Sequence, residues 1–263
     1  MDLPPLFPSM IAFLLSAVIV AGAQVIYATV GFGAGMFSVA LLALLLPDLR
    51  GAVAALWLLT LVTEVWVLAH AWHHARVRFL LGLLPTTVIG LWIGTEILSS
   101  ADVSGLKRAL GGVVLAAGTW FLYRDATTQE DTGDARHVRR EGVRVWLSAP
   151  AGLVSGLLAG LFGTGGPPVI VLLKSYRLDK SAFRATILWF FLLMSVVRGV
   201  TYLRAEVLAG DELRAALWLL PGSLAGAVLG SMVHHRLSEG IFARVVSVLL
   251  MILGALLLLT GGR

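Results

Sequence analysis

The sequence predicts an all-α polytopic membrane protein made of two inverted repeats, each with about five hydrophobic segments. Of the 263 residues, 58% are hydrophobic and only 13% are charged, more apolar surface than a soluble domain of this length can bury. The apolar residues fall in blocks of roughly 20, the length of a helix that crosses a hydrocarbon core of about 30 Å. The blocks lack the alternation of a barrel strand, so helices are expected.

The apolar segments divide the chain into a first membrane repeat (1–123), a cytoplasmic linker (124–145) and a second membrane repeat (146–263). The segments of the first repeat are predicted at about 8–30, 34–47, 51–70, 79–98 and 105–123. Those of the second repeat are predicted at about 146–162, 167–176, 182–203, 212–233 and 241–260.

The second segment of each repeat is short. In the second copy Pro168–Tyr176 would cover only about 13 Å as a helix, roughly half of the hydrocarbon thickness. We therefore expect each short segment to re-enter the membrane or to form half of a broken helix.

Repeated glycines support an ancestral duplication. The cluster at 31–35 recurs at 163–167, an offset of 132, and Gly94 recurs as Gly230, an offset of 136. Because each copy has an odd number of segments, the second copy is expected to run in the opposite direction to the first.

Most of the 20 Lys and Arg residues lie in short loops on one side of the predicted bundle. The positive-inside rule then predicts a protein of the bacterial inner membrane with both termini outside and the linker on the cytoplasmic side. Basic residues in such loops are typical of membrane orientation, so no nucleic-acid partner is expected. The first segment follows Asp2 without a Lys or Arg, so it is interpreted as a retained segment.

The chain contains no cysteine and no G-x-x-x-x-G-K-[ST] motif. These absences exclude thiolate chemistry and a Walker-type phosphate loop. No ATP hydrolysis, cofactor or metal is expected, and transport would draw on a gradient.

Short segments broken by glycine and proline at matching positions of two repeats indicate the binding site of a transporter. A helix N-terminus exposes unpaired N–H groups and the positive end of the helix dipole, so it can bind an anion. The predicted substrate-binding residues at the two breaks are Gly31, Gly33, Gly35, Met36, Gly163, Thr164, Gly165, Gly166, Pro167 and Val169. The alternative is that these glycines only allow helices to pack closely.

The paired glycine turns and the stretch Gly-Leu-Phe-Gly-Thr-Gly-Gly-Pro-Pro at 160–168 resemble the sulfite and organosulfonate exporter family, TauE/SafE. The resemblance extends from about Ala12 to Thr260. It implies a secondary transporter that exports small anions such as sulfite, sulfonates or short organic acids. The first copy departs from the pattern, since it has Gly35-Met36 where the second has Pro167-Pro168.

Glu64 and Arg198 are charged residues inside apolar segments, where charge is costly and often functional. They occupy equivalent places in the two repeats, and inversion is expected to put them in opposite halves of the membrane. Arg198 is therefore predicted to bind the anion, and Glu64 to act separately in proton coupling or gating. Alternatively, each side chain snorkels or bonds to a neighbouring helix. Thr60 and Ser195 are among the hydroxyl side chains that could also donate to a ligand.

His70, His73 and His74 have the H-x-x-H-H spacing of iron-binding boxes in membrane desaturases. Only three further histidines are present, too few for a di-iron site, so an interfacial loop is the preferred interpretation. Three function classes stay open: an anion transporter, which is preferred, an anion channel, and a histidine-metal membrane enzyme. The expected partners are a small anionic substrate and membrane lipid, and ion coupling and homo-oligomer formation are left open.

Overall fold

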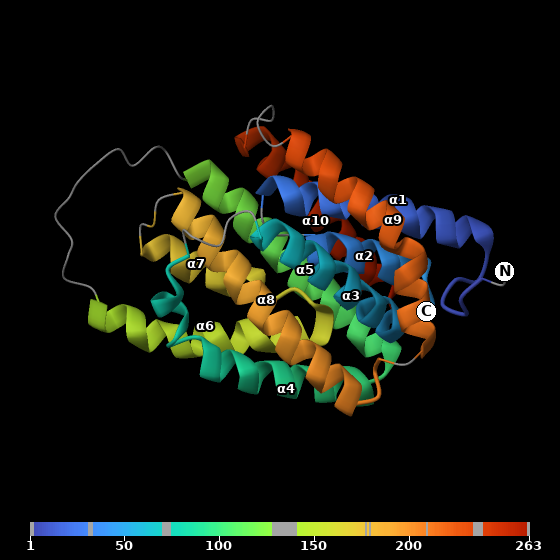
Figure 1. The fold of residues 1–263 in the computed structure, drawn as a ribbon, viewed down its shortest axis with the longest axis horizontal. Coiled ribbons are helices and arrows are strands. Elements are labelled where there is room, and N and C mark those ends of the chain that lie inside the picture. The colour runs from blue at the N-terminus through green and yellow to red at the C-terminus, as the bar shows by residue number, and fades with distance from the viewer. Residues whose placement is uncertain are drawn as a thin grey trace.

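The structure is a computed structural model that describes residues 3–30, 34–69, 75–127, 141–176, 178, 180–208, 210–233 and 239–261. These residues form ten α-helices and one short 3-10 helix, η2 (Val77–Leu80), and contain no strand. Figure 1 shows the helices gathered in one bundle.

The ten helices confirm the ten predicted segments, and each limit lies within about five residues of its expected place. In chain order they are α1 (Met10–Val30), α2 (Ala34–Leu45), α3 (Leu49–Leu68), α4 (Leu84–Ser100), α5 (Val103–Thr127), α6 (Glu141–Phe162), α7 (Gly166–Ser175), α8 (Lys180–Arg204), α9 (Gly210–Val233) and α10 (Glu239–Thr260). By length and composition, α1, α3, α8 and α9 each contain a stretch that could span a membrane. Large apolar side chains such as Ile11, Trp92 and Leu229 are exposed on the outer helices, as lipid-facing residues are.

Three helix pairs form most of the bundle: α1 with α9, α4 with α6, and α5 with α10. Glycines allow the close approach. A Cβ on Gly90 of α4 would collide with the Leu153 carbonyl of α6, and a Cβ on Gly226 of α9 would collide with the Ala21 carbonyl of α1. Small residues at such contacts let helix backbones approach closely in membrane proteins.

The helices α3 and α8 lie side by side in the bundle (Figure 1). Trp57 of α3 donates its indole N–H to the Ser195 carbonyl of α8 over 2.7 Å. Its ring covers Gly199, where any Cβ would collide with it. The contact between α3 and α8 is therefore fixed by the Trp57 side chain, which packs against Gly199 and donates a hydrogen bond to the Ser195 carbonyl.

The short helix α7 follows a backbone break at 163–165, as the sequence predicted, whereas residues 31–33 before α2 lie outside the described residues. At 12 and 10 residues, α2 and α7 rise only about 18 Å and 15 Å, so neither crosses the hydrocarbon core alone. The end of α6 has an αL-type cap, in which Gly163 takes a φ of +68°. The Gly163 N–H donates to Ala159 over 2.9 Å, and the Thr164 N–H donates to Leu158 over 3.3 Å. Glycine is needed at this position because an L side chain rarely adopts that φ.

Candidate functional site

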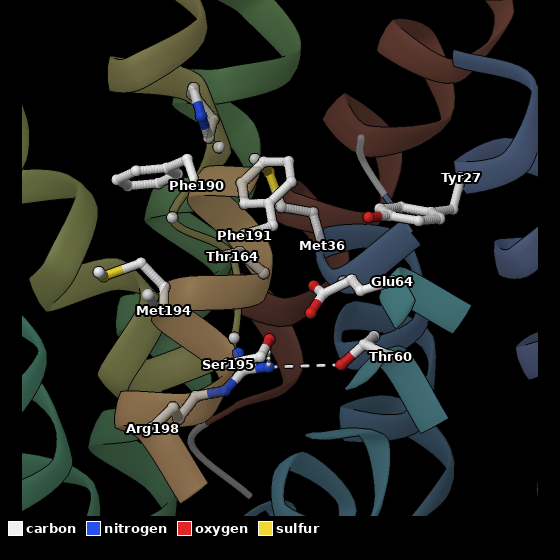
Figure 2. Close-up of a pocket in the computed structure, with 16 residues that line it drawn as sticks. Tyr27, Met36, Thr60, Glu64, Thr164, Phe190, Phe191, Met194, Ser195 and Arg198 are labelled. Carbon is white, nitrogen blue, oxygen red and sulfur yellow. Dashed lines mark hydrogen bonds between the residues drawn. The ribbon is translucent and has the colours of Figure 1, made fainter. Parts of the chain in front are cut away.

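Six helices converge on one cavity of about 60 Å³ beside the two breaks. A buried water needs roughly 10–15 Å³ on this measure, so the cavity holds about four to six water-sized units. The lining residues, most of them labelled in Figure 2, are Tyr27, Gly35, Met36, Thr60, Glu64, Ala159, Gly163, Thr164, Gly165, Gly166, Pro167, Phe190, Phe191, Met194, Ser195 and Arg198. The cavity has the size of a small anion.

The start of α2 lies beside the break that follows α6 in the folded protein. A Cβ added to Gly35, near the start of α2, would lie 2.8 Å from the Gly163 carbonyl oxygen at the end of α6. Gly35 and Met36 line one side of the cavity, and Gly166 at the start of α7 lines another. The N-terminal turns of both short helices therefore contribute to the same cavity.

Arg198 is the cation of the site, and its side chain is only 5% exposed. Its Nη2 donates to the Thr60 hydroxyl over 3.3 Å and lies 3.5 Å from the Ser195 hydroxyl. The guanidinium also lies 5.9 Å from the ring centroid of Tyr202, within the range of a cation–π contact. Its Nε has no hydrogen-bond partner in the described part of the chain. The guanidinium retains donor capacity for a ligand.

Glu64 faces the same cavity and is also 5% exposed. Arg198 and Ser195 line the same cavity, so the carboxylate lies near a positive charge and a hydroxyl group. One carboxylate oxygen, Oε2, has no hydrogen-bond partner among the described residues. Figure 2 shows the carboxylate directed into the space between α3 and α8.

The expectation that inversion separates Glu64 from Arg198 is wrong, because both side chains line one cavity. The reason is where the helices touch: α3 and α8 are in contact at Trp57 and Thr60, in the middle of α3. Glu64 lies only about 6 Å of helix rise beyond Thr60. The long arginine side chain reaches back toward its own helix N-terminus and spans the remaining distance.

Most of the residues predicted for substrate binding lie on the cavity. Gly35, Met36, Gly163, Thr164, Gly165, Gly166, Pro167 and Arg198 line it. The Thr164 hydroxyl is buried there and has no hydrogen-bond partner in the described residues. Gly165 touches both the cavity and α6, since a Cβ on it would lie 2.6 Å from the Ser155 carbonyl.

Val169 is not at the cavity, contrary to the prediction. It does not line the cavity but is fully buried in the apolar cluster behind it, with Leu91 and Leu173. The helix α7 already begins at Gly166, so Val169 belongs to its packed first turn.

Some of the residues singled out from the sequence cannot be compared with the cavity. Gly31, Gly33 and the histidines at 70, 73 and 74 lie outside the described residues. Within the described residues, no group of three or more His, Asp or Glu side chains could hold a metal ion.

Sequence reasoning missed the apolar part of the lining. Phe190, Phe191 and Met194 of α8 line the cavity together with Tyr27 of α1. The available signal was helical spacing, since residues 191, 194 or 195, and 198 share one face of α8. In a segment made almost entirely of apolar residues, this spacing does not distinguish a cavity-facing side of the helix from a core-facing or lipid-facing side.

Comparisons with known proteins agree with the architecture. The family model described as "Sulfite exporter TauE/SafE" matches residues 14–257. A protein of Cupriavidus necator named "Probable sulfite/organosulfonate exporter TauE" is 28% identical over 183 residues, which cover 67% of each chain. No solved structure matches. The match over nearly the whole chain establishes that this membrane protein belongs to the sulfite exporter TauE/SafE family of transporters.

Proposed function

We propose that the chain is a secondary transporter that exports a small anion across the bacterial inner membrane by alternating access around the cavity. The observation that carries the proposal is a buried cation, Arg198, in a small cavity where two glycine breaks meet. The family and the named relative support export of sulfite, sulfonates or short organic acids. Without a Walker-type motif, the driving force is an ion gradient or the gradient of the anion itself.

The anion is held by Arg198 together with groups at the two breaks. The first turns of α2 and α7 present backbone N–H groups at Gly35, Met36 and Gly166. Such groups stabilise negative charge through hydrogen bonds and the helix dipole. The unpartnered Thr164 hydroxyl adds a further donor. Pro167 has no N–H, so the second break offers fewer backbone donors than the first.

Inverted repeats would explain how the cavity is built. Eight of its lining residues form pairs at offsets of 132 or 134, the offsets found between the two halves of the sequence. The pairs are Tyr27 with Ala159, Gly35 with Pro167, Thr60 with Met194, and Glu64 with Arg198. A binding site on the axis that relates two repeats has this property.

The close contacts of Gly90 and Gly226 with adjacent helices repeat in the same way. The contact of Gly90 with Leu153 corresponds to the contact of Gly226 with Ala21, with the two repeats exchanged. In Figure 1 the two chain termini lie at one end of the bundle, and the ends of α5 and α6 that face the linker lie at the other. This arrangement supports opposite orientations for the two five-helix halves.

Glu64 would couple anion binding to a proton. An anion bound to Arg198 inside this cavity brings a second negative charge close to the Glu64 carboxylate. Two such charges about 5 Å apart repel by about 3 kcal/mol at an effective dielectric constant of about 20. Anion binding therefore favours a neutral Glu64, and a proton enters the site with the anion, so that export by this route is driven by the outward gradient of the anion itself.

The test is anion flux in proteoliposomes with sulfite, sulfoacetate, taurine, thiosulfate and lactate as substrates. The proposal predicts saturable flux of at least one of these compounds, accompanied by proton movement. Flux that rises linearly with concentration and moves no protons would instead identify an anion channel.

A further inference from the structure

The cavity has two chemically different ends. Arg198, Thr60 and Ser195 lie at one end in Figure 2, whereas the aromatic rings of Phe190 and Phe191 lie at the other. The apolar end is completed by two thioether side chains, those of Met36 and Met194, which are 3% and 4% exposed.

The apolar end is tightly organised. The rings of Phe190 and Phe191 meet edge to face with centroids 5.8 Å apart. The tip of the Phe191 ring lies 3.3 Å from the position of a Cβ on Gly166, so the ring packs beside the start of α7. A small residue at this position of α7 leaves the ring room to line the cavity.

The spacing along α8 sets the length of a ligand that touches both ends. Phe191 and Arg198 are seven residues apart on one face of the helix, which corresponds to about 10 Å of rise. The guanidinium points back to Ser195 and shortens that gap. A charged head on Arg198 then leaves space for only a few carbon atoms before the ring of Phe191.

A bare inorganic oxyanion does not match this lining. All of its oxygens need donors, but an aromatic and thioether surface offers none and would only remove water from it. An anion with a short hydrocarbon group matches both ends, because the head meets the cation and each methylene buried on the apolar end favours binding roughly fourfold.

We infer that Phe191 and Met194 form a tail subsite, which selects small anions that carry a hydrocarbon group of one to three carbons over inorganic oxyanions. This inference rests on the proposed function, since it assumes that the anionic head binds Arg198. The cavity volume of about 60 Å³ sets the upper limit on the tail.

The experiment measures binding of methane-, ethane-, propane- and butanesulfonate to the purified full-length protein by titration calorimetry. All four probes have the same head and charge, so differences report on the tail. We expect the affinity to rise about threefold to fourfold per methylene and then to fall once the tail outgrows the cavity. Affinities within twofold of one another across the series would overturn the inference.

Two variants test the residues. Met194→Thr places at 194 the residue found at its repeat partner, Thr60, and should reduce the gain per methylene to less than twofold. Phe191→Leu should shift the optimum to a longer tail. The control Phe37→Leu changes a partly buried phenylalanine of α2 outside the cavity lining and should leave the series unchanged. Unchanged series in both test variants would also overturn the inference.

The results separate this inference from the proposed function. If Arg198→Ala abolishes binding of every sulfonate while the wild-type series is flat, the anion site stands and the tail subsite is wrong. If Arg198→Ala binds the whole series as tightly as the wild type, the anion site itself is wrong, and the tail subsite fails with it.

Discussion

The Arg198 guanidinium packs against Gly163, so that a Cβ added to this glycine would be 2.7 Å from Nη1. The glycine thus has two tasks, since it also adopts the positive φ that ends α6. The guanidinium stands at the C-terminal end of α6, where the helix dipole favours positive charge. One residue therefore connects the helix break with the position of the cation.

Gly163→Ala should both strain the backbone and displace Arg198. We expect a loss of about 1–2 kcal/mol in stability from the positive φ and a weaker affinity for the anion. Gly112→Ala is the control, because a Cβ on Gly112 meets nothing within 4 Å. Thermal unfolding in detergent and anion titration measure the two effects. A Gly163→Ala protein as stable and as tight-binding as Gly112→Ala would refute this role.

Glu64→Gln should remove the proton linked to anion binding. In the wild type we expect uptake of up to one proton per anion and tighter binding at low pH, because a neutral Glu64 does not repel the ligand. In Glu64→Gln the proton uptake should be close to zero and the affinity should vary little with pH. Calorimetry in buffers of different ionisation enthalpy counts the protons. Equal proton uptake in both proteins would show that another group is responsible.

Single cysteines can establish the orientation, because the chain has none of its own. A cysteine at Ser100, which is exposed at the end of α4, should react with an impermeant reagent in intact cells. A cysteine at Thr128 in the linker should react only after the cells are opened. Labelling of Thr128→Cys in intact cells would reverse the topology and remove the positive-inside argument.

Substitution of Gly90 and of Gly226 should lower stability by similar amounts if the two halves are related by inversion. Gly90→Ala and Gly226→Ala each push a Cβ into a backbone carbonyl of the adjacent helix, so both should lower the unfolding temperature by similar amounts. Gly22→Ala, with open space around it, should have little effect. A large loss for one glycine and none for the other would speak against equivalent packing in the two repeats.

The sequence predicted the helices well because one physical quantity, apolar block length, decides where a membrane helix forms. It also pointed correctly to the break before α7, where glycine and proline mark the end of regular structure. The place of the cavity beside Gly35 and Gly163 follows from the same reasoning.

The contacts between helices were harder to predict. The proximity of Glu64 to Arg198 depends on which residues of α3 and α8 are in contact, and the hydropathy pattern does not determine this. Val169 was misplaced because the exact start of α7 decides which amides stay free. Phe191 and Met194 were missed because, in an apolar segment, the sequence does not distinguish an apolar residue that lines a cavity from one in the core or facing lipid.

The central claim is that the transported anion binds at Arg198 in this cavity, and the most direct test is the affinity of Arg198→Ala for an anion that the wild type binds. Loss of a charge-assisted hydrogen bond predicts at least a tenfold weaker affinity, with Arg198→Lys intermediate because it keeps the charge but loses the planar fork. Both variants must elute as monodisperse protein. An affinity for Arg198→Ala within twofold of the wild type would contradict the account.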